Sequence, residues 1–129
     1  MSTDFTLLAW SALLCLVLAV PYTIGLTQLL GLPILTGNRE NFPTVEGWIG
    51  RAKRAHMNMV ENLIPFAALV LVAHAAGKAD AMTALGAQLF FWARLAHAVV
   101  YIAGYAWVRT AAYAVALVGM VMIFLAIIR

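Results

Sequence analysis

The chain is poor in charge and nearly free of cysteine. Only 10% of its 129 residues are charged and 65% are hydrophobic, whereas about a quarter of the residues in a soluble domain carry charge. Such a chain cannot cover an apolar core with a polar surface, which excludes a water-soluble monomer, and it is too apolar to remain disordered. Its single cysteine, Cys15, excludes a disulfide-stabilised secreted module. These absences leave an integral membrane protein with one domain, residues 1–129.

Several functional motifs are missing as well. No Cys/His spacing indicates a metal site and no glycine-rich loop could hold a phosphate, so we expect no metal. The basic residues flank or interrupt apolar segments and form no exposed stripe, which argues against nucleic acid as a partner. Residues 1–5 carry no basic cluster ahead of the first apolar run, so we expect no cleaved signal peptide. The lack of an inverted repeat disfavours a small transporter.

Four apolar segments are long enough to cross a bilayer, whose core of about 30 Å needs about 20 helical residues. They span about 5–30, 51–76, 81–105 and 109–128. Pro21 predicts a kink in the first segment, Gly77 a C-cap after the second, and a brief turn around Trp107 joins the last two. Residues 31–50 are expected to form the one long loop. The pattern predicts an all-α integral membrane four-helix bundle.

The basic residues outside the spans predict the orientation in the membrane. The first and third loops lie on one side and carry Arg39, Arg51, Lys53, Arg54 and Arg109, whereas the second loop and the C-terminus carry Lys78 and Arg129. Because cytoplasmic loops collect Lys and Arg, we expect the first and third loops to be cytoplasmic and both termini to be outside.

Polar residues interrupt three of the four spans at helical spacing. They are Arg51, Arg54, Asn58, Glu61 and Pro65 in the second span, Arg94, His97, Tyr101 and Tyr105 in the third, and Arg109 and Tyr113 in the fourth. Each set falls on one helix face. A charge at the centre of a membrane helix costs about 2.5–3.5 kcal/mol, so such residues usually face the bundle interior and serve function. His74 lies apart from these stripes, and we expect it to be structural.

Together the stripes offer guanidinium groups, one carboxylate, one amide, one imidazole and several phenols. This set suits a small ligand with carboxylates and an amine, because arginine binds carboxylates in a fork and glutamate accepts from an ammonium group. Four short helices enclose little volume, so we expect the site to lie between subunits of a homo-oligomer. Two structural alternatives stay open: Arg54 and Glu61 neutralise each other, or Arg51 and Lys53 only anchor the helix at the membrane surface.

The run from Arg51 to Phe66, RAKRAHMNMVENLIPF, resembles the signature helix of the MAPEG family, the membrane-associated proteins in eicosanoid and glutathione metabolism. Residues 93–101 (ARLAHAVVY) are similar to the third helix of that family, and residues 109–113 (RTAAY) to the start of its fourth. The loop segment 37–43 (GNRENFP) resembles the first loop of bacterial members. The resemblance covers the chain from about residue 37 to its end, in the family's order and spacing.

The resemblance implies a homotrimer that binds glutathione, as cosubstrate, in a cytoplasm-facing cleft between neighbouring subunits. It implies that this cleft is lined by Arg54, Asn58, Glu61, Arg94, His97, Tyr101 and Tyr113, and the stripe on the second span adds Arg51. It also implies that Arg109 and the hydroxyl of Thr110 stabilise the glutathione thiolate. A thiol with a pKa of about 8.5 is mostly protonated at neutral pH, and a neighbouring guanidinium favours the thiolate, which is the nucleophile.

The function implied is a membrane-bound glutathione transferase or peroxidase of a bacterial inner membrane, acting on lipophilic electrophiles or hydroperoxides among the membrane lipids. The alternative is a non-catalytic lipid-binding or scaffold member of the same family. Arg109 favours the enzyme. Two departures favour the alternative: residues 27–30 (TQLL) lack the basic residue that many glutathione-using members carry late in the first helix, and Met57 stands where many have arginine.

Overall fold

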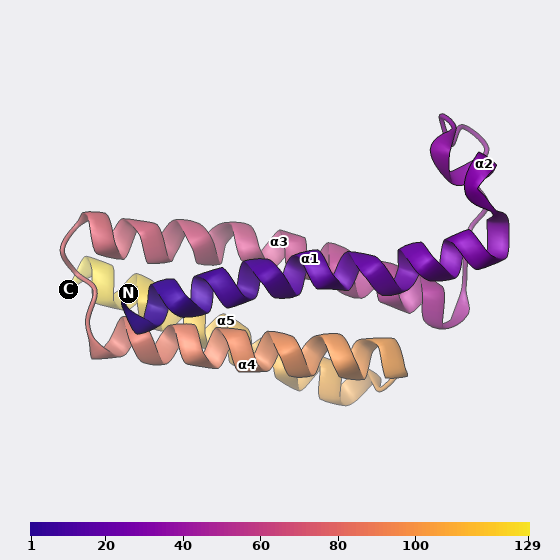
Figure 1. Ribbon diagram of the computed structural model, residues 1–129. Helices are drawn as coiled ribbons and strands as arrows, with labels where there is room; N and C mark the ends of the chain where they lie inside the picture. The colour runs from indigo at the N-terminus through magenta and orange to yellow at the C-terminus, as the bar shows by residue number, and fades with distance from the viewer.

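The computed structural model describes all residues, 1–129, and contains helices and no strand (Figure 1). The long helices are α1 (Thr3–Leu30), α3 (Gly47–Ala75), α4 (Ala81–Ala103) and α5 (Ala106–Ile128), and α2 (Leu32–Thr36) is a short fifth helix. At 1.5 Å per residue, the long helices measure about 35 to 44 Å, and all four are long and apolar enough to cross a membrane. The predicted all-helical chain with four membrane-length helices is confirmed.

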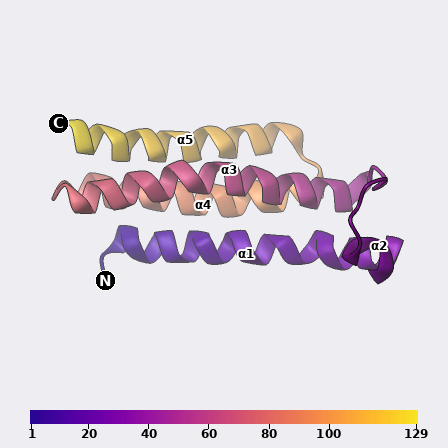
Figure 2. The ribbon, with the colours of Figure 1, turned by 90° about the horizontal axis from the view of Figure 1, so that it is seen from above.

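Successive long helices run in opposite directions, so the connections gather at two ends of the bundle. One end holds both chain termini and the α3–α4 turn, and we call it the terminal end (Figure 1). The other end holds α2, the segment 37–46 and the α4–α5 turn, and we call it the loop end. In Figure 2, α1 and α5 lie on opposite sides of the pair formed by α3 and α4. One face of the bundle is therefore formed by α1 and the opposite face by α5.

The helix boundaries differ from the predicted spans mainly at the loop end. The helix α3 begins at Gly47, α4 ends at Ala103 and α5 begins at Ala106, so Trp107 lies in the first turn of α5 instead of in the connection. The segment 31–50 also contains α2, which Pro33 starts at its second position. Both α3 and α5 begin a few residues earlier than predicted. In each helix uncharged residues precede the first basic one, and the helix includes them back to the point where the backbone leaves the helical conformation.

Two glycines turn the backbone after α3 and α4. Gly77 has φ +67° and Gly104 has φ +97°, conformations that other residues rarely adopt. After α4, the N–H of Gly104 bonds to Tyr101 O and the N–H of Tyr105 to Val100 O. This paired arrangement is the Schellman motif, which satisfies the last carbonyls of a helix. The Gly77 turn repeats it with His74 O and Ala73 O as acceptors.

Two glycines also let α4 and α5 approach each other closely. A Cβ atom added at Gly86 would lie 2.5 Å from the carbonyl oxygen of Gly119, and one added at Gly119 would collide with the carbonyl oxygen of Gly86. Small residues allow membrane helices to pack backbone against backbone, where dispersion replaces the hydrophobic effect as the driving force. Phe66 of α3 stacks on Phe90 of α4 in the adjoining core, with ring centroids 3.8 Å apart.

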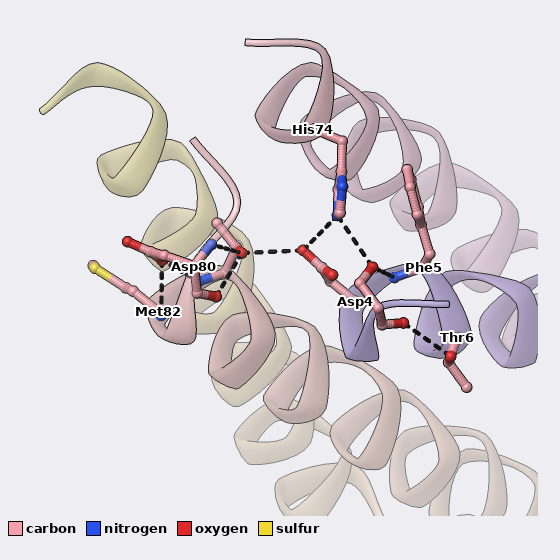
Figure 3. A network of polar contacts seen from close by, with 8 residues as sticks. Asp4, Phe5, Thr6, His74, Asp80 and Met82 are labelled. Carbon is pink, nitrogen blue, oxygen red and sulfur yellow. Dashed lines mark hydrogen bonds and ion pairs between the residues drawn. The ribbon is translucent and has the colours of Figure 1, made fainter. Parts of the chain in front are cut away.

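A buried carboxylate joins three helices at the terminal end (Figure 3). Asp4 of α1 is only 3% exposed. Its Oδ2 accepts from Thr83 Oγ1 of α4 at 3.0 Å and lies 2.9 Å from His74 Nε2 of α3. Phe5 stacks on the His74 ring with centroids 3.7 Å apart. A buried carboxylate is costly unless it is hydrogen-bonded, so these partners stabilise the docking of α1 against α3 and α4.

The fourth long helix is joined to the same end by an ion pair. Arg129, directly after α5, pairs with Asp80, the N-cap residue of α4. Asp80 also accepts from the N–H groups of Met82 and Thr83, and its own N–H donates to Thr83 Oγ1. This reciprocal capping box satisfies donors that the start of α4 would otherwise leave free. Polar contacts thus connect all four long helices at the terminal end.

Candidate functional site

Six of the ten predicted site residues line one pocket toward the loop end. The pocket has a volume of about 240 Å³ and is lined by Asn58 of α3, His97 and Tyr101 of α4, and Arg109, Thr110 and Tyr113 of α5. Five of these side chains carry a hydrogen-bond donor at neutral pH, and His97 carries one on at least one ring nitrogen. No carboxylate lines the pocket. The arrangement therefore favours a ligand that is anionic or rich in acceptors.

Arg109 lies near the start of α5, with its guanidinium carbon 4.5 Å from the centroid of the Tyr101 ring. This cation–π contact holds the guanidinium over the last turn of α4. The N–H groups of the first turn of α5 are free of helical partners, since the first backbone bond of the helix runs from Arg109 N to Tyr105 O. A helix N-terminus carries partial positive charge, which adds to that of Arg109. Thr110 follows, and its hydroxyl donates to Ala106 O at 3.1 Å.

Arg94 does not line this pocket but contacts Asn58, which does, and it is only 1% exposed. Its Nη2 donates to Asn58 Oδ1 at 2.7 Å, while its Nε and Nη1 have no hydrogen-bond partner. Because arginine can only donate, the oxygen of the Asn58 amide must face Arg94 and the amide NH₂ is left for other acceptors. His97 is 2% exposed, its Nδ1 has no partner, and its ring meets Tyr101 edge to face. Buried donors without acceptors cost about 1–3 kcal/mol each.

The other three predicted site residues lie outside this pocket. Arg51 is half-buried and donates from Nε to Ile102 O at 2.9 Å. Arg54 is exposed, and its head group turns back toward Gly50, where it lines a separate hollow of about 300 Å³ beside the loop. Glu61 is exposed on the outer side of α3. No ion pair joins Arg54 to Glu61, so the two do not neutralise each other within the chain.

Sequence reasoning missed one residue that touches the site. Asn62 is 8% exposed, and its Nδ2 donates to Asn58 O at 2.8 Å and, more weakly, to Asn58 Oδ1 at 3.4 Å. It therefore supports the amide that Arg94 also holds. Its position four residues after Asn58 was the available signal, because side chains at that spacing meet on one helix face.

The residues offer no metal centre, since nowhere do three His, Cys, Asp or Glu side chains gather closely enough to hold an ion. The chain was compared with known proteins, and the model of the MAPEG family matches residues 5–129. The chain belongs to the MAPEG family. No curated protein and no solved structure matches it. As a MAPEG protein with four membrane-length helices, it is an integral multi-pass membrane protein.

The MAPEG family, to which this chain belongs, has roles in glutathione and eicosanoid metabolism. The family includes glutathione transferases and also members that are not transferases. The match covers both the stripe-bearing helices and the first helix, so the whole bundle is the MAPEG domain. Family membership alone assigns no reaction to this MAPEG protein, so its chemistry is inferred from the residues that line the pocket.

Proposed function

We propose that this protein is a membrane-bound glutathione transferase or peroxidase that activates the glutathione thiol. The observation that carries the proposal is the position of Arg109: it lines the pocket and lies near the start of α5, close in sequence to the free N–H groups of that helix N-terminus. The guanidinium and the positive end of the helix both add positive potential on this side of the pocket, which favours a bound anion. Thr110 lines the same pocket, and its hydroxyl, which donates to Ala106 O without ligand, would turn to donate to the bound thiolate.

A thiolate beside Arg109 is the reactive group in this mechanism. The positive field lowers the free energy of the thiolate relative to the thiol, so more of the bound glutathione is ionised at neutral pH. In the transferase reaction, the sulfur forms a bond to the electrophilic carbon and the leaving group departs with its electron pair. In the peroxidase reaction, the sulfur attacks one peroxide oxygen, the O–O bond breaks, and the other oxygen leaves with the electron pair and takes up a proton from water to give the alcohol. The resulting sulfenic acid condenses with a second glutathione to give the disulfide and water.

The buried donors behind the thiolate position suit the rest of glutathione. Arg94 has two nitrogens without partners, and the NH₂ of Asn58 faces away from Arg94. A carboxylate or peptide carbonyl of the ligand would satisfy these groups, and charge-assisted hydrogen bonds to arginine are the strongest available. His97 and Tyr113 complete the wall of the pocket.

We further propose that the enzyme is a homotrimer with each site shared between two subunits. The pocket of one chain, about 240 Å³, is smaller than the roughly 300–1,000 Å³ usual for small-molecule sites. Glu61 stands at the midpoint of the 29-residue α3 and is exposed, a position where a lone carboxylate would face lipid. A neighbouring subunit that covers this face would bring Glu61 and Arg54 to the site of its partner. By the positive-inside rule, the loop end faces the cytoplasm of a bacterial inner membrane.

A direct titration tests the proposal. Detergent-solubilised protein is titrated with glutathione while the ultraviolet absorbance of the thiolate is followed, and conjugation to a lipophilic electrophile is measured alongside. Arg109→Ala should remove the thiolate signal and lower the conjugation rate about 10²–10³-fold, the usual cost of losing one such donor. Arg109→Lys should recover part of the rate, because the ammonium keeps the charge but lacks the planar fork.

The matched control is Arg39→Ala, which removes another loop-end cation that bonds to Leu35 O and does not line the pocket. It should leave both signals unchanged. A wild-type protein that binds lipid but gives neither a thiolate signal nor conjugation would favour the non-catalytic alternative. One observation favours that alternative: the end of α1 supplies no cation to the site, and the hydroxyl of Thr27 bonds within its own helix to Thr23 O.

A further inference from the structure

The side chain of Arg51 is hydrogen-bonded within the protein. It lies in the second turn of α3, and its Nε donates to the carbonyl oxygen of Ile102, in the last turn of α4, at 2.9 Å. The head group also packs on the α4–α5 turn: a Cβ atom added at Gly104 would lie 3.6 Å from Arg51 Nε and 3.7 Å from its Cζ. The side chain thus crosses from one helix to the end of another that is far away in sequence.

The end of α4 needs a cation of this kind. The last carbonyls of a helix have no partner within it, and the C-terminus carries partial negative charge. The Schellman turn at Gly104 satisfies Val100 O and Tyr101 O. Arg51 satisfies Ile102 O, and its charge lies at the negative end of the α4 dipole.

The turn that Arg51 braces leads directly into the reactive part of the site. Tyr101, in the last turn of α4, lies under the Arg109 guanidinium, and Arg109 N bonds to Tyr105 O in the turn. A shift of this turn would therefore move Arg109 relative to Tyr101. An error of about 1 Å in such a position can cost a reaction about 10²-fold.

We infer that Arg51 is a positioning residue: it fixes the α4–α5 turn and thereby places Arg109 and Thr110, and it does not bind glutathione itself. The part of this inference that concerns activity rests on the proposed function. The part that concerns the turn does not, since it follows from the Arg51–Ile102 bond alone.

Hydrogen exchange tests the turn without any ligand. In Arg51→Gln, the protected N–H groups of Gly104, Tyr105 and Arg109 should exchange about 10-fold faster or more, the size expected for the loss of a charge-assisted hydrogen bond. Arg51→Lys should fall between, because it keeps the charge at the helix end. Lys53→Gln is the matched control: it removes an exposed cation from the same helix, one that lies over Phe42 and not over the turn. Unchanged exchange in Arg51→Gln would overturn the inference.

Glutathione and its dimethyl ester, which lacks both carboxylate charges, separate positioning from binding. If Arg51 positions Arg109, Arg51→Gln should raise the pKa of the bound thiol and lower kcat to the same extent with both compounds. If Arg51 binds a carboxylate, the variant should weaken glutathione and leave the ester unaffected, which would contradict the inference. A wild-type protein that binds neither compound would refute the proposed function, and the exchange measurement would still decide whether Arg51 braces the turn.

Discussion

At the terminal end, the buried carboxylate of Asp4 has partners on both neighbouring helices, whereas nearer the loop end Arg94 and His97 keep buried nitrogens without any. Both regions belong to membrane-spanning helices and both contain charge, imidazole and hydroxyl groups. In the first region the partners come from the chain itself, and the contacts hold helices together. In the second they are missing, which leaves bonds for a ligand or another subunit to make.

This contrast separates two uses of buried polarity. A satisfied buried group contributes modestly to stability, and removing its partner is costly. An unsatisfied buried group lowers the stability of the ligand-free protein. A ligand or a second subunit that pairs with it therefore gains binding free energy. Substitutions at the two ends should therefore change stability in opposite directions, and the following predictions test that difference.

The largest effect is expected at Glu61, the carboxylate exposed at the middle of α3. If a neighbouring subunit supplies its partner, Glu61→Gln leaves that partner unpaired inside the trimer, at a cost of about 3–5 kcal/mol. Mass measurement in mild detergent should show three chains for the wild type and fewer for the variant, with weaker glutathione binding. Glu46→Gln, at the exposed N-cap of α3, is the control and should stay trimeric. Three chains and unchanged melting in Glu61→Gln would show that the carboxylate is merely tolerated.

A smaller loss is expected at the terminal end. Asp4→Asn keeps the shape of the side chain but removes the charge that accepts from Thr83 and lies beside His74. Hydrogen bonds to charged groups contribute about 1.5–3 kcal/mol, so the melting temperature should fall. Thiolate formation should stay normal, because this network is at the opposite end from the pocket. The control Glu40→Gln removes an exposed acid with no partner and should change neither. A loss of thiolate in Asp4→Asn would mean that the two ends are coupled.

The smallest effect, and the one with opposite sign, is expected at Arg94. Arg94→Met removes two donors that have no partner and keeps most of the volume. It also removes the Nη2 bond to Asn58 Oδ1, but that oxygen keeps a weaker bond from Asn62. Without ligand, the free energy of unfolding should stay the same or rise by about 1 kcal/mol, since replacing buried ionic groups by apolar ones is often neutral or favourable. Glutathione should no longer raise the melting temperature. Gln88→Met, an exposed polar residue of the same helix, should keep the glutathione effect. A clear loss of ligand-free stability in Arg94→Met would contradict our interpretation.

Much of the fold could be predicted from length and apolar content, because a bilayer sets the number of residues that a helix needs. Periodicity likewise brought Asn58, His97 and Arg109 to one side of the bundle, where the structure places them around one pocket. It could not predict where a long side chain ends. Arg54 shares the Asn58 face of α3 but its head group folds back to Gly50, since arginine reaches far beyond the helix face that carries it.

Contacts between residues far apart in sequence were also beyond prediction. Asp4 lies just ahead of the predicted first span, about 5–30, and nothing in the neighbouring sequence indicates a partner for it. Its partners His74 and Thr83 lie 70 and 79 residues later and belong to two other helices, so no local pattern connects them. The predicted end of α4 and the predicted start of α5 were wrong for a related reason. The backbone turns at Gly104, and the polar residues on either side do not mark that turn.

The close approach of α4 and α5 has a consequence for how this sequence can evolve. At Gly86 and Gly119 each added carbon would meet the main chain of the opposite helix, which every amino acid shares. A clash with a side chain can be relieved by trimming that side chain, but a clash with a carbonyl oxygen cannot. No substitution at one glycine can therefore compensate for a change at the other. The two positions should accept new residues only together with a new separation of the helices, and that separation would carry Arg109 away from Tyr101.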